Sequence, residues 1–125
     1  MNIKESLEFN NFVIIGNTIN KEKYAYKIKS SILRANKNCF SIKEDGNSLN
    51  EVPFDIDVLD LCINPKYGLE YLKDSKKTYK YVVIQPGAES DEIINYLKEH
   101  NIDYVLGCLL LAFKVYKGIE VENND

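Results

Sequence analysis

Hydrophobic residues occur along the chain in short, continuous runs that longer mixed segments separate. The apolar runs lie at residues 12–15, 39–42, 58–63, 81–85 and 104–106. Continuous apolarity is typical of strands that are covered on both faces, as strands of a parallel sheet are. The pattern therefore predicts five buried strands.

The segments between these runs have the spacing of helices. In residues 21–36, Ala25, Ile28, Ile32 and Ala35 fall on one helical face. Asn64-Pro65 is a typical helix start, which predicts a helix to residue 74, and Ser90 is a suitable cap for a further helix. The remaining expectations are a short lead-in helix at 3–9, a polar turn segment at 44–56 and a terminal turn at 109–115.

Strands that alternate with helices predict a three-layer α/β fold of Rossmann-like type with a five-stranded parallel sheet. We expect the strand order 3-2-1-4-5, as in doubly wound sheets. In that order a crevice opens between the first and fourth strands, where residues 16–18 and 85–88 leave the sheet. We expect one domain over residues 1–119 and an acidic, flexible tail over 120–125.

Charge and composition exclude several classes of protein. The formal net charge is −3 and the pI is about 5.2, which disfavours nucleic acid as a partner. No apolar run reaches the roughly 18 residues of a membrane span, and residues 1–5 do not have the pattern of a secretory signal. Three cysteines without metal-binding spacing indicate reduced thiols, so we expect a cytoplasmic protein without a metal site.

The segment after the first strand has the chemistry of a phosphate-binding loop. Gly16 allows close approach of the backbone, and Asn17 and Thr18 add side-chain donors at the start of a helix. Lys21, Lys23 and Lys27 follow and could neutralise a diphosphate. The competing interpretation is a simple strand end with solvated lysines.

The full dinucleotide fingerprint GxGxxG is absent. Glu44 lies near the end of the second strand, where NAD enzymes place an acid for the ribose. Lys43 precedes it and favours a ligand with an additional phosphate near the adenosine. These residues leave both NAD and a 3′-phosphorylated nucleotide open.

Residues suited to catalysis are few. His100 is the only histidine and fits a helix C-terminus better than an active site. Cys39 and Cys62 fit the core, whereas Cys108 could meet the thiol of a ligand. Most tyrosines, including Tyr67 and Tyr71, are expected at the boundary of the core, and Tyr24 could pack on a ligand. The sequence favours binding over catalysis.

Several of these segments together resemble a known family. They are Phe12 to Thr18, Lys23 to Lys27, Asp60 to Pro65, Ile84 to Ala88 and Gly107 to Leu110. The pattern is similar to that of small bacterial CoA-binding domain proteins and of the N-terminal domain of the succinyl-CoA synthetase alpha subunit. The family usually has Gly-x-Ser in the first loop and Asn-Pro after the second strand, whereas this chain has Gly16-Asn17-Thr18 and Lys43-Glu44.

The resemblance implies coenzyme A (CoA) or an acyl-CoA as the ligand. Residues 16–18 and the following helix start would hold the diphosphate, and Lys43 would contact the 3′-phosphate. The other implied site residues are Lys23, Tyr24, Lys27, Asn64, Pro65, Gln85, Pro86, Gly87, Ala88 and Cys108. We expect a binding module that is non-catalytic on its own, with a protein partner or a homodimer possible. The alternatives are a sensor of NAD(H) or another adenine nucleotide, and an enzyme subunit that acts on CoA thioesters with a partner chain.

Overall fold

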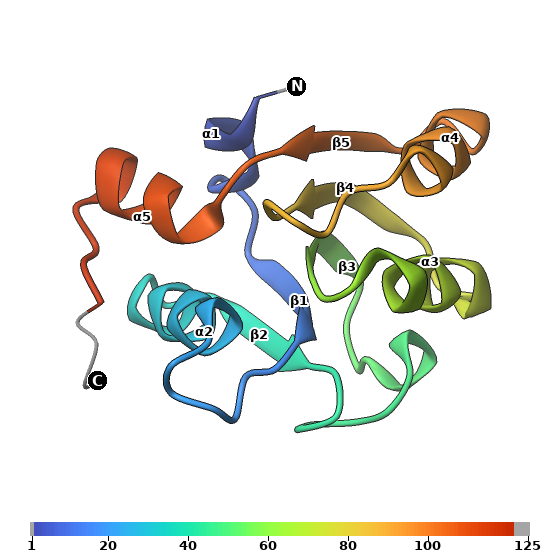
Figure 1. The fold of residues 1–125 in the computed structure, drawn as a ribbon. Helices are drawn as coiled ribbons and strands as arrows, with labels where there is room; N and C mark the ends of the chain where they lie inside the picture. The colour runs from blue at the N-terminus through green and yellow to red at the C-terminus, as the bar shows by residue number, and fades with distance from the viewer. Residues whose placement is uncertain (1, 122–125) are drawn as a thin grey trace.

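The computed structural model describes residues 2–121 and has five parallel strands between two helical layers (Figure 1). The strands are β1 (Asn11–Gly16), β2 (Asn38–Ser41), β3 (Ile56–Cys62), β4 (Tyr79–Ile84) and β5 (Asp103–Leu106). The helices are α1 (Ile3–Ser6), α2 (Tyr24–Arg34), α3 (Pro65–Asp74), α4 (Asp91–Glu99) and α5 (Leu109–Lys117), with a 3₁₀ turn at Leu49–Glu51. The predicted α/β class with a five-stranded parallel sheet is confirmed.

The strand order is 2-1-3-4-5, so the predicted order 3-2-1-4-5 is wrong. β2 is short and begins with the exposed Asn38, which suits an edge, whereas six of the seven residues of β3 are buried. Leu49 and Val52, between these strands, pack on the sheet face opposite α2. A right-handed crossover on the face opposite α2 carries the chain from β2 back past β1. β3 therefore pairs with β1 on the side away from β2.

The two helical layers bury two separate cores, one on each face of the sheet. Figure 1 shows α1, α2 and α5 on one side of the sheet and α3 and α4 on the other. The α2-side core includes Phe12, Ile14, Ile28, Tyr81 and Phe113. The α3-side core includes Val13, Ile15, Leu59, Val82 and Ile93. Adjacent residues of β1 serve opposite cores, as the two-residue repeat of a strand requires.

The last apolar segment forms a nine-residue helix, α5, and not the short turn that we expected. Leu109, Ala112 and Phe113 are buried on one side of it, and they join the α2-side core. Gly118 ends the helix in the left-handed conformation with a φ of 66°. The remaining residues of the predicted acidic tail, 122–125, lie outside the described residues.

β1 and β3 approach so closely at their carboxyl ends that only glycine fits at position 16. A Cβ atom on Gly16 would lie 2.6 Å from the carbonyl oxygen of Cys62 and 3.0 Å from Cβ of Ala25. The backbone oxygen belongs to the strand that pairs with β1, so it cannot move aside without breaking the ladder. Gly16 is therefore a packing requirement of the sheet as well as a loop residue.

One carboxylic acid lies in the interior of the sheet. Asp60 of β3 is fully buried on the α2 side, and its Oδ1 accepts a 2.7 Å hydrogen bond from Nε2 of Gln85. Its Oδ2 has no hydrogen-bond partner among the residues that the structure describes. Burial raises the pKa of Asp60 from 3.8 to about 7, against the opposing effect of the Gln85 hydrogen bond.

We expect Gly16→Ala to lower the free energy of unfolding by about 1–3 kcal/mol, because the new methyl group overlaps a fixed carbonyl oxygen. Gly68→Ala is the matched control: its Cβ would meet no atom closer than 3.6 Å inside helix α3. That change should raise stability by about 0.5–1 kcal/mol. Urea unfolding of both variants measures the difference, and equal stabilities would contradict the contact geometry.

We expect the acid in β3 to make the fold less stable as the pH rises. Between pH values of about 3.8 and about 7, the unfolded chain ionises Asp60 while the folded chain retains the proton. The folded state then binds more protons, so its stability falls with pH by at most about 1.4 kcal/mol per unit. Asp60→Asn should remove this loss, so its unfolding free energy relative to wild type should increase across the window.

Asp57→Asn is the control of opposite sign. Burial raises the pKa of Asp57, but Lys80 and the backbone N–H of Asn11 outweigh that effect and lower it. Its stabilisation is present above the ordinary carboxyl pKa and is lost as the pH falls through the lowered value. Urea unfolding at several pH values would refute the assignment if Asp60→Asn followed the wild-type pH profile.

Candidate functional site

The carboxyl edge of the sheet holds a cavity of about 500 Å³ over the end of β1. Its wall is formed by the segments that leave β1, β2 and β3, and by the first turns of α3. The lining residues are Ile15, Gly16, Asn17, Thr18, Ile19, Lys23, Ile42, Lys43, Cys62, Ile63, Asn64, Tyr67 and Tyr71. We call this the inner cavity.

A second, wider cavity of about 700 Å³ adjoins the first and runs along α3. Lys43, Ile63, Tyr67 and Tyr71 line both cavities. The second cavity has three further lining residues that the inner cavity lacks: Glu70, Lys73 and Asp74. We call this the outer cavity, and the two together form one continuous groove.

The loop that follows β1 is shaped by its own asparagines. The Oδ1 atom of Asn17 accepts hydrogen bonds from the backbone N–H groups of Ile19 at 3.1 Å and Asn20 at 3.0 Å. These bonds form a local turn that competes with helix and delays the start of α2 to Tyr24. We had expected the helix from residue 21.

The N-terminus of α2 has a lysine at its N-cap position, and Glu22 directly precedes that lysine. Its N-cap residue Lys23 makes no side-chain cap, and no acidic residue lies in its first turn. By contrast, α3 and α4 are capped by side-chain oxygens of Asn64 and Ser90. Of the residues at the positive end of the α2 dipole, Lys23 lines the cavity, and the backbone N–H of Ala25 bonds to Cys62.

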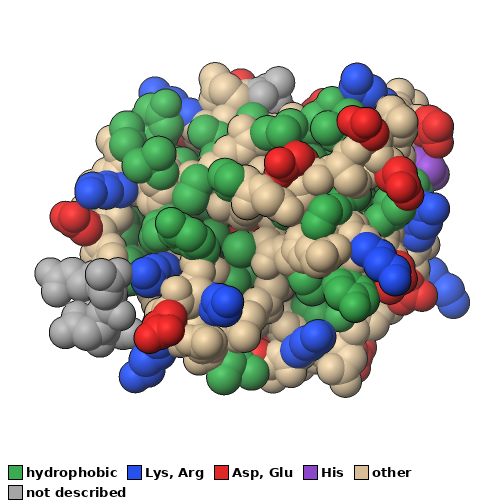
Figure 2. Space-filling view, viewed as in Figure 1, with side chains coloured by type: hydrophobic (Ala, Val, Ile, Leu, Met, Phe, Trp, Pro, Cys, Tyr) green, Lys and Arg blue, Asp and Glu red, His purple; other side chains and the backbone are tan. Residues whose placement is uncertain are grey.

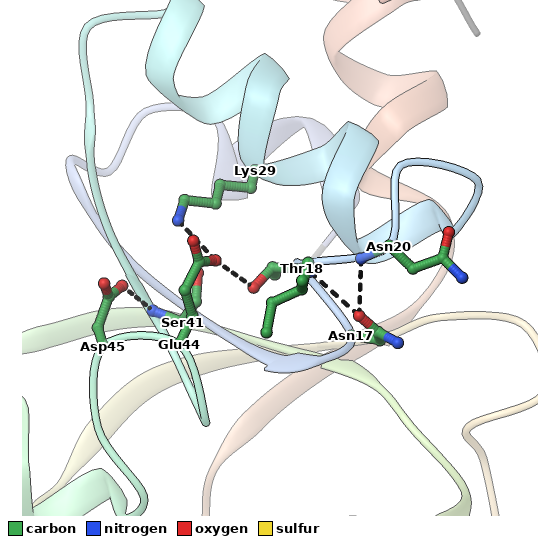
Figure 3. A network of polar contacts seen from close by, with 8 residues as sticks. Asn17, Thr18, Asn20, Lys29, Ser41, Glu44 and Asp45 are labelled. Carbon is green, nitrogen blue, oxygen red and sulfur yellow. Dashed lines mark hydrogen bonds and ion pairs between the residues drawn. The ribbon is translucent and has the colours of Figure 1, made fainter. Parts of the chain in front are cut away.

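Glu44 ties the first loop to the segment after β2 (Figure 3). Its Oε1 accepts hydrogen bonds from Oγ1 of Thr18 at 2.7 Å and from Nζ of Lys29 at 2.9 Å. These two donors lower the pKa of Glu44. Thr18 is buried and its hydroxyl proton points to Glu44, so the hydroxyl stabilises the loop in this structure.

Lys43 differs from the adjacent Glu44, because its side chain lines the cavity. Its backbone has a φ of 80°, a left-handed conformation that is uncommon for a lysine. Among residues 2–121, its side chain makes no hydrogen bond or ion pair. The turn that follows β2 thus brings Glu44 to Thr18 and Lys29 at the surface and leaves Lys43 lining both cavities.

Six of the sequence-predicted site residues come together in the inner cavity: Gly16, Asn17, Thr18, Lys23, Lys43 and Asn64. Figure 2 shows basic side chains among hydrophobic ones over the part of this face where the β1 loop and α3 lie. Pro65 is the first residue of α3 and does not line the cavity. Lys27 lies on α2, with Nζ 5.9 Å from the centre of the Tyr24 ring.

We had expected the loop at 85–88 to share a crevice with residues 16–18. It does not, because β3 lies between β1 and β4. Residues 85–88 line neither the inner nor the outer cavity. They form a tight turn in which the N–H of Ala88 donates to the carbonyl of Gln85 and Gly87 has a φ of 92°. Proline followed by a glycine at positive φ is the pattern of a type II turn.

Tyr24 and Cys108 line a different depression, of about 360 Å³, between α2 and α5. Burial raises the pKa of both other cysteines, Cys39 and Cys62, to about 12. His100 lies at the end of α4, with its ring 4.1 Å from that of Tyr96. In the described part of the chain, no group of His, Cys, Asp and Glu side chains is arranged to hold a metal ion.

Ile63, Tyr67 and Tyr71 line both cavities but were not among the site residues predicted from the sequence. The two tyrosines are four positions apart on α3, which places them on one face directly after the exit of β3. That spacing was visible in the sequence. It could not be used, because the predicted strand order put the fourth strand beside β1, and not β3 with the helix that follows it.

Comparison with solved structures finds the same fold in several proteins. A redesigned binding protein, Prb, superposes with a TM-score of 0.84 at 19% identity, covering 96% of this chain and 93% of that one. A conserved hypothetical protein from Pyrococcus furiosus has 26% identity and a TM-score of 0.71, with 86% of this chain and 100% of that chain covered. A Thermus thermophilus protein has 18% identity and a TM-score of 0.79, with 91% and 98% covered.

No curated protein matches the chain with significant similarity. None of the helices within residues 2–121 is long and apolar enough to cross a membrane. The model of the CoA binding domain family matches residues 10–114, which include both cavities and all five strands. The resemblance noted in the sequence is therefore confirmed, and the chain belongs to the CoA binding domain family.

Proposed function

We propose that this chain binds CoA or an acyl-CoA in the groove over β1 and acts as a binding module without catalytic activity of its own. The observation that carries the proposal is the composition of the inner cavity. Lys43 and Lys23, the N-cap residue of α2, line it, and its lining contains no acidic residue. This is the environment that a diphosphate requires.

Membership of the CoA binding domain family supports CoA over other anionic ligands. The hydrogen bonds that Glu44 makes within the protein support CoA over NAD as the ligand. An acid that binds a ribose diol must offer its carboxylate to the ligand, and in Glu44 the oxygen Oε1 already accepts bonds from Thr18 and Lys29, which leaves Oε2 alone for a diol. Lys43 is the charged residue that remains for the ribose, and a cation suits the 3′-phosphate of CoA.

The side chains around the groove support binding rather than catalysis. The only cysteine in the inner cavity is Cys62, and its raised pKa keeps the thiol protonated and poorly nucleophilic. The single histidine, His100, lies on α4 and lines neither cavity. We therefore assign Gly16, Asn17, Lys23, Lys43 and Asn64 to binding.

The other site residues implied by the family pattern have more distant roles in this proposal. Residues 85–88 close the carboxyl edge of the sheet beyond β3, and Tyr24 and Cys108 lie where the pantetheine arm could leave the groove. A partner chain, or a second copy of this one, would have to supply any catalytic group.

The proposal is tested by the thermal stability of the purified protein with CoA, acetyl-CoA, dephospho-CoA, NAD and NADP. A ligand present at 100 times its dissociation constant should add about 2.7 kcal/mol of stability. We expect the CoA species to stabilise the fold more than NAD or NADP. Absence of stabilisation by any CoA species at millimolar concentration would refute the proposal.

We expect Lys43→Gln to weaken CoA binding about tenfold, because it removes a charge-assisted contact to the 3′-phosphate. Binding of dephospho-CoA, which lacks that phosphate, should change by less than about twofold. Lys76→Gln is the control, because it makes the same change of charge in the loop between α3 and β4, at the opposite edge of the sheet. Calorimetric titration gives both affinities, and equal weakening of both ligands by Lys43→Gln would show that Lys43 does not read the phosphate.

A further inference from the structure

Helix α5 carries apolar side chains beyond the side that it buries. Its inner side joins the α2-side core, as described above. Leu111, Val115 and Tyr116 lie at the surface, where they are 59%, 63% and 49% exposed. A surface helix normally has polar residues outside its buried stripe, and a helix that is apolar around most of its circumference is typical of a covered position. The outer side of α5 therefore has the composition of a surface that another molecule covers.

A groove of about 260 Å³ lies between α1 and α5, and we call it the α1–α5 groove. It is lined by Ile3, Gly107, Cys108, Leu111, Ala112, Val115 and Tyr116. In the part of the chain that the structure describes, no charged side chain lines it. Figure 1 shows α1 beside α5, and Figure 2 shows hydrophobic side chains gathered over α5.

The wall that α1 contributes to this groove is fixed by its own contacts. Ile3 packs so closely on Gly107 that a Cβ atom there would lie 2.9 Å from Cδ1 of Ile3. The hydroxyl of Tyr81 donates a 3.0 Å hydrogen bond to the carbonyl of Asn2, directly before the helix. The groove is thus formed within a single chain, which lowers the cost of ordering it on association.

The α1–α5 groove has a ridge beside it. Leu111 and Val115 are four positions apart on α5, so they stand one above the other on the same face of the helix. Helices pack by placing such ridges into the grooves of a neighbour. A face that carries a ridge and a groove side by side is complementary to itself, as a contact between two identical subunits requires.

The charges around the groove favour a second copy of this chain as its partner. Residues 2–9 and 107–121 carry three basic and three acidic side chains: Lys4, Lys114, Lys117, Glu5, Glu8 and Glu120. Nζ of Lys114 lies 3.3 Å from Glu120, and Nζ of Lys117 lies 3.5 Å from Glu8. Balanced charges allow two identical faces to meet without repulsion, whereas an anionic membrane attracts surfaces with an excess of lysine and arginine. Residues 122–125 carry no apolar side chain to fill the groove.

We propose that two copies of this chain form a homodimer through α5, with Leu111 and Val115 of each copy seated in the α1–α5 groove of the other. This contact covers the outer side of α5 in both copies at once. It goes beyond the proposed function and is independent of it, because no residue lines both the α1–α5 groove and either cavity of the candidate site.

Sedimentation velocity of the purified chain over a range of concentrations tests the proposal. We expect the 14.4 kDa monomer to give way to a particle of twice that mass at micromolar concentration. Leu111→Glu and Val115→Glu should each raise the dissociation constant of the dimer at least about tenfold, because each change buries two unpaired carboxylates in the contact. Both side chains are more than half exposed in the monomer, so circular dichroism of the two variants should match that of the wild type.

Leu33→Glu is the matched control, because Leu33 is a 50% exposed leucine of α2 that does not line the groove. It should dimerise like the wild type. A wild-type chain that stays monomeric at every concentration, or a dimer that persists in both α5 variants, would overturn the proposal. Flotation of a monomeric wild type with vesicles of phosphatidylcholine and phosphatidylglycerol would also overturn it and would assign the patch to a lipid surface. None of these results depends on CoA, so the proposed function is tested separately.

Discussion

The close pairing of β1 with β3 at Gly16 and Cys62 is the contact on which the rest of the molecule depends. It places two strands with continuous buried segments side by side, so that each face of the sheet can support a separate core. It also determines where the chain reverses direction, because β2 lies to one side of β1 and β3 to the other. Loops that leave neighbouring strands toward opposite faces leave a crevice between them. The groove over β1 follows from this pairing.

The same contact explains why the first loop must serve two purposes. Gly16 is required by the carbonyl oxygen of Cys62, whether or not a ligand approaches the backbone. A glycine at the end of the first strand is therefore poor evidence for a phosphate site when it stands alone. The evidence comes from what surrounds it, namely Lys23 at the N-cap of α2 and Lys43 after β2, which both line the inner cavity.

The sequence predicted the class of fold because continuous apolar runs and helical spacing are local properties. Strand order depends on which neighbour a strand finds, and this is decided by long-range packing. The burial of Leu49 and Val52 opposite α2 directed the crossover after β2, but nothing in their immediate neighbours indicates a face. The nine residues of α5 were missed for a related reason, since an apolar run of that length fits a helix or a turn until its partner core is known.

The predicted site residues line the inner cavity where their place follows from local sequence, and lie away from it where their place depends on topology. Residues 16–18, Lys23, Lys43 and Asn64 follow directly after strands, and the carboxyl ends of parallel strands meet at one edge. Residues 85–88 also follow a strand, but β3 separates them from β1. Tyr67 and Tyr71 were assigned to the core boundary because a tyrosine pair on an amphipathic helix usually lies there.

An acidic chain can present a cationic cavity when the carboxylates near that cavity are bonded to other parts of the protein. Three carboxylates at the carboxyl edge of the sheet are bonded in this way. Glu44 is held by Thr18 and Lys29, and Glu51 accepts bonds from the backbone of Asn47 and Ser48. Asp45 binds the backbone N–H of Ser41 in the same way. Each of these carboxylates has a partner within the protein, and none of them lines the inner or the outer cavity. The net charge of −3 therefore excludes little about the ligand, because the local field over β1 is determined by Lys23, Lys43 and the α2 dipole.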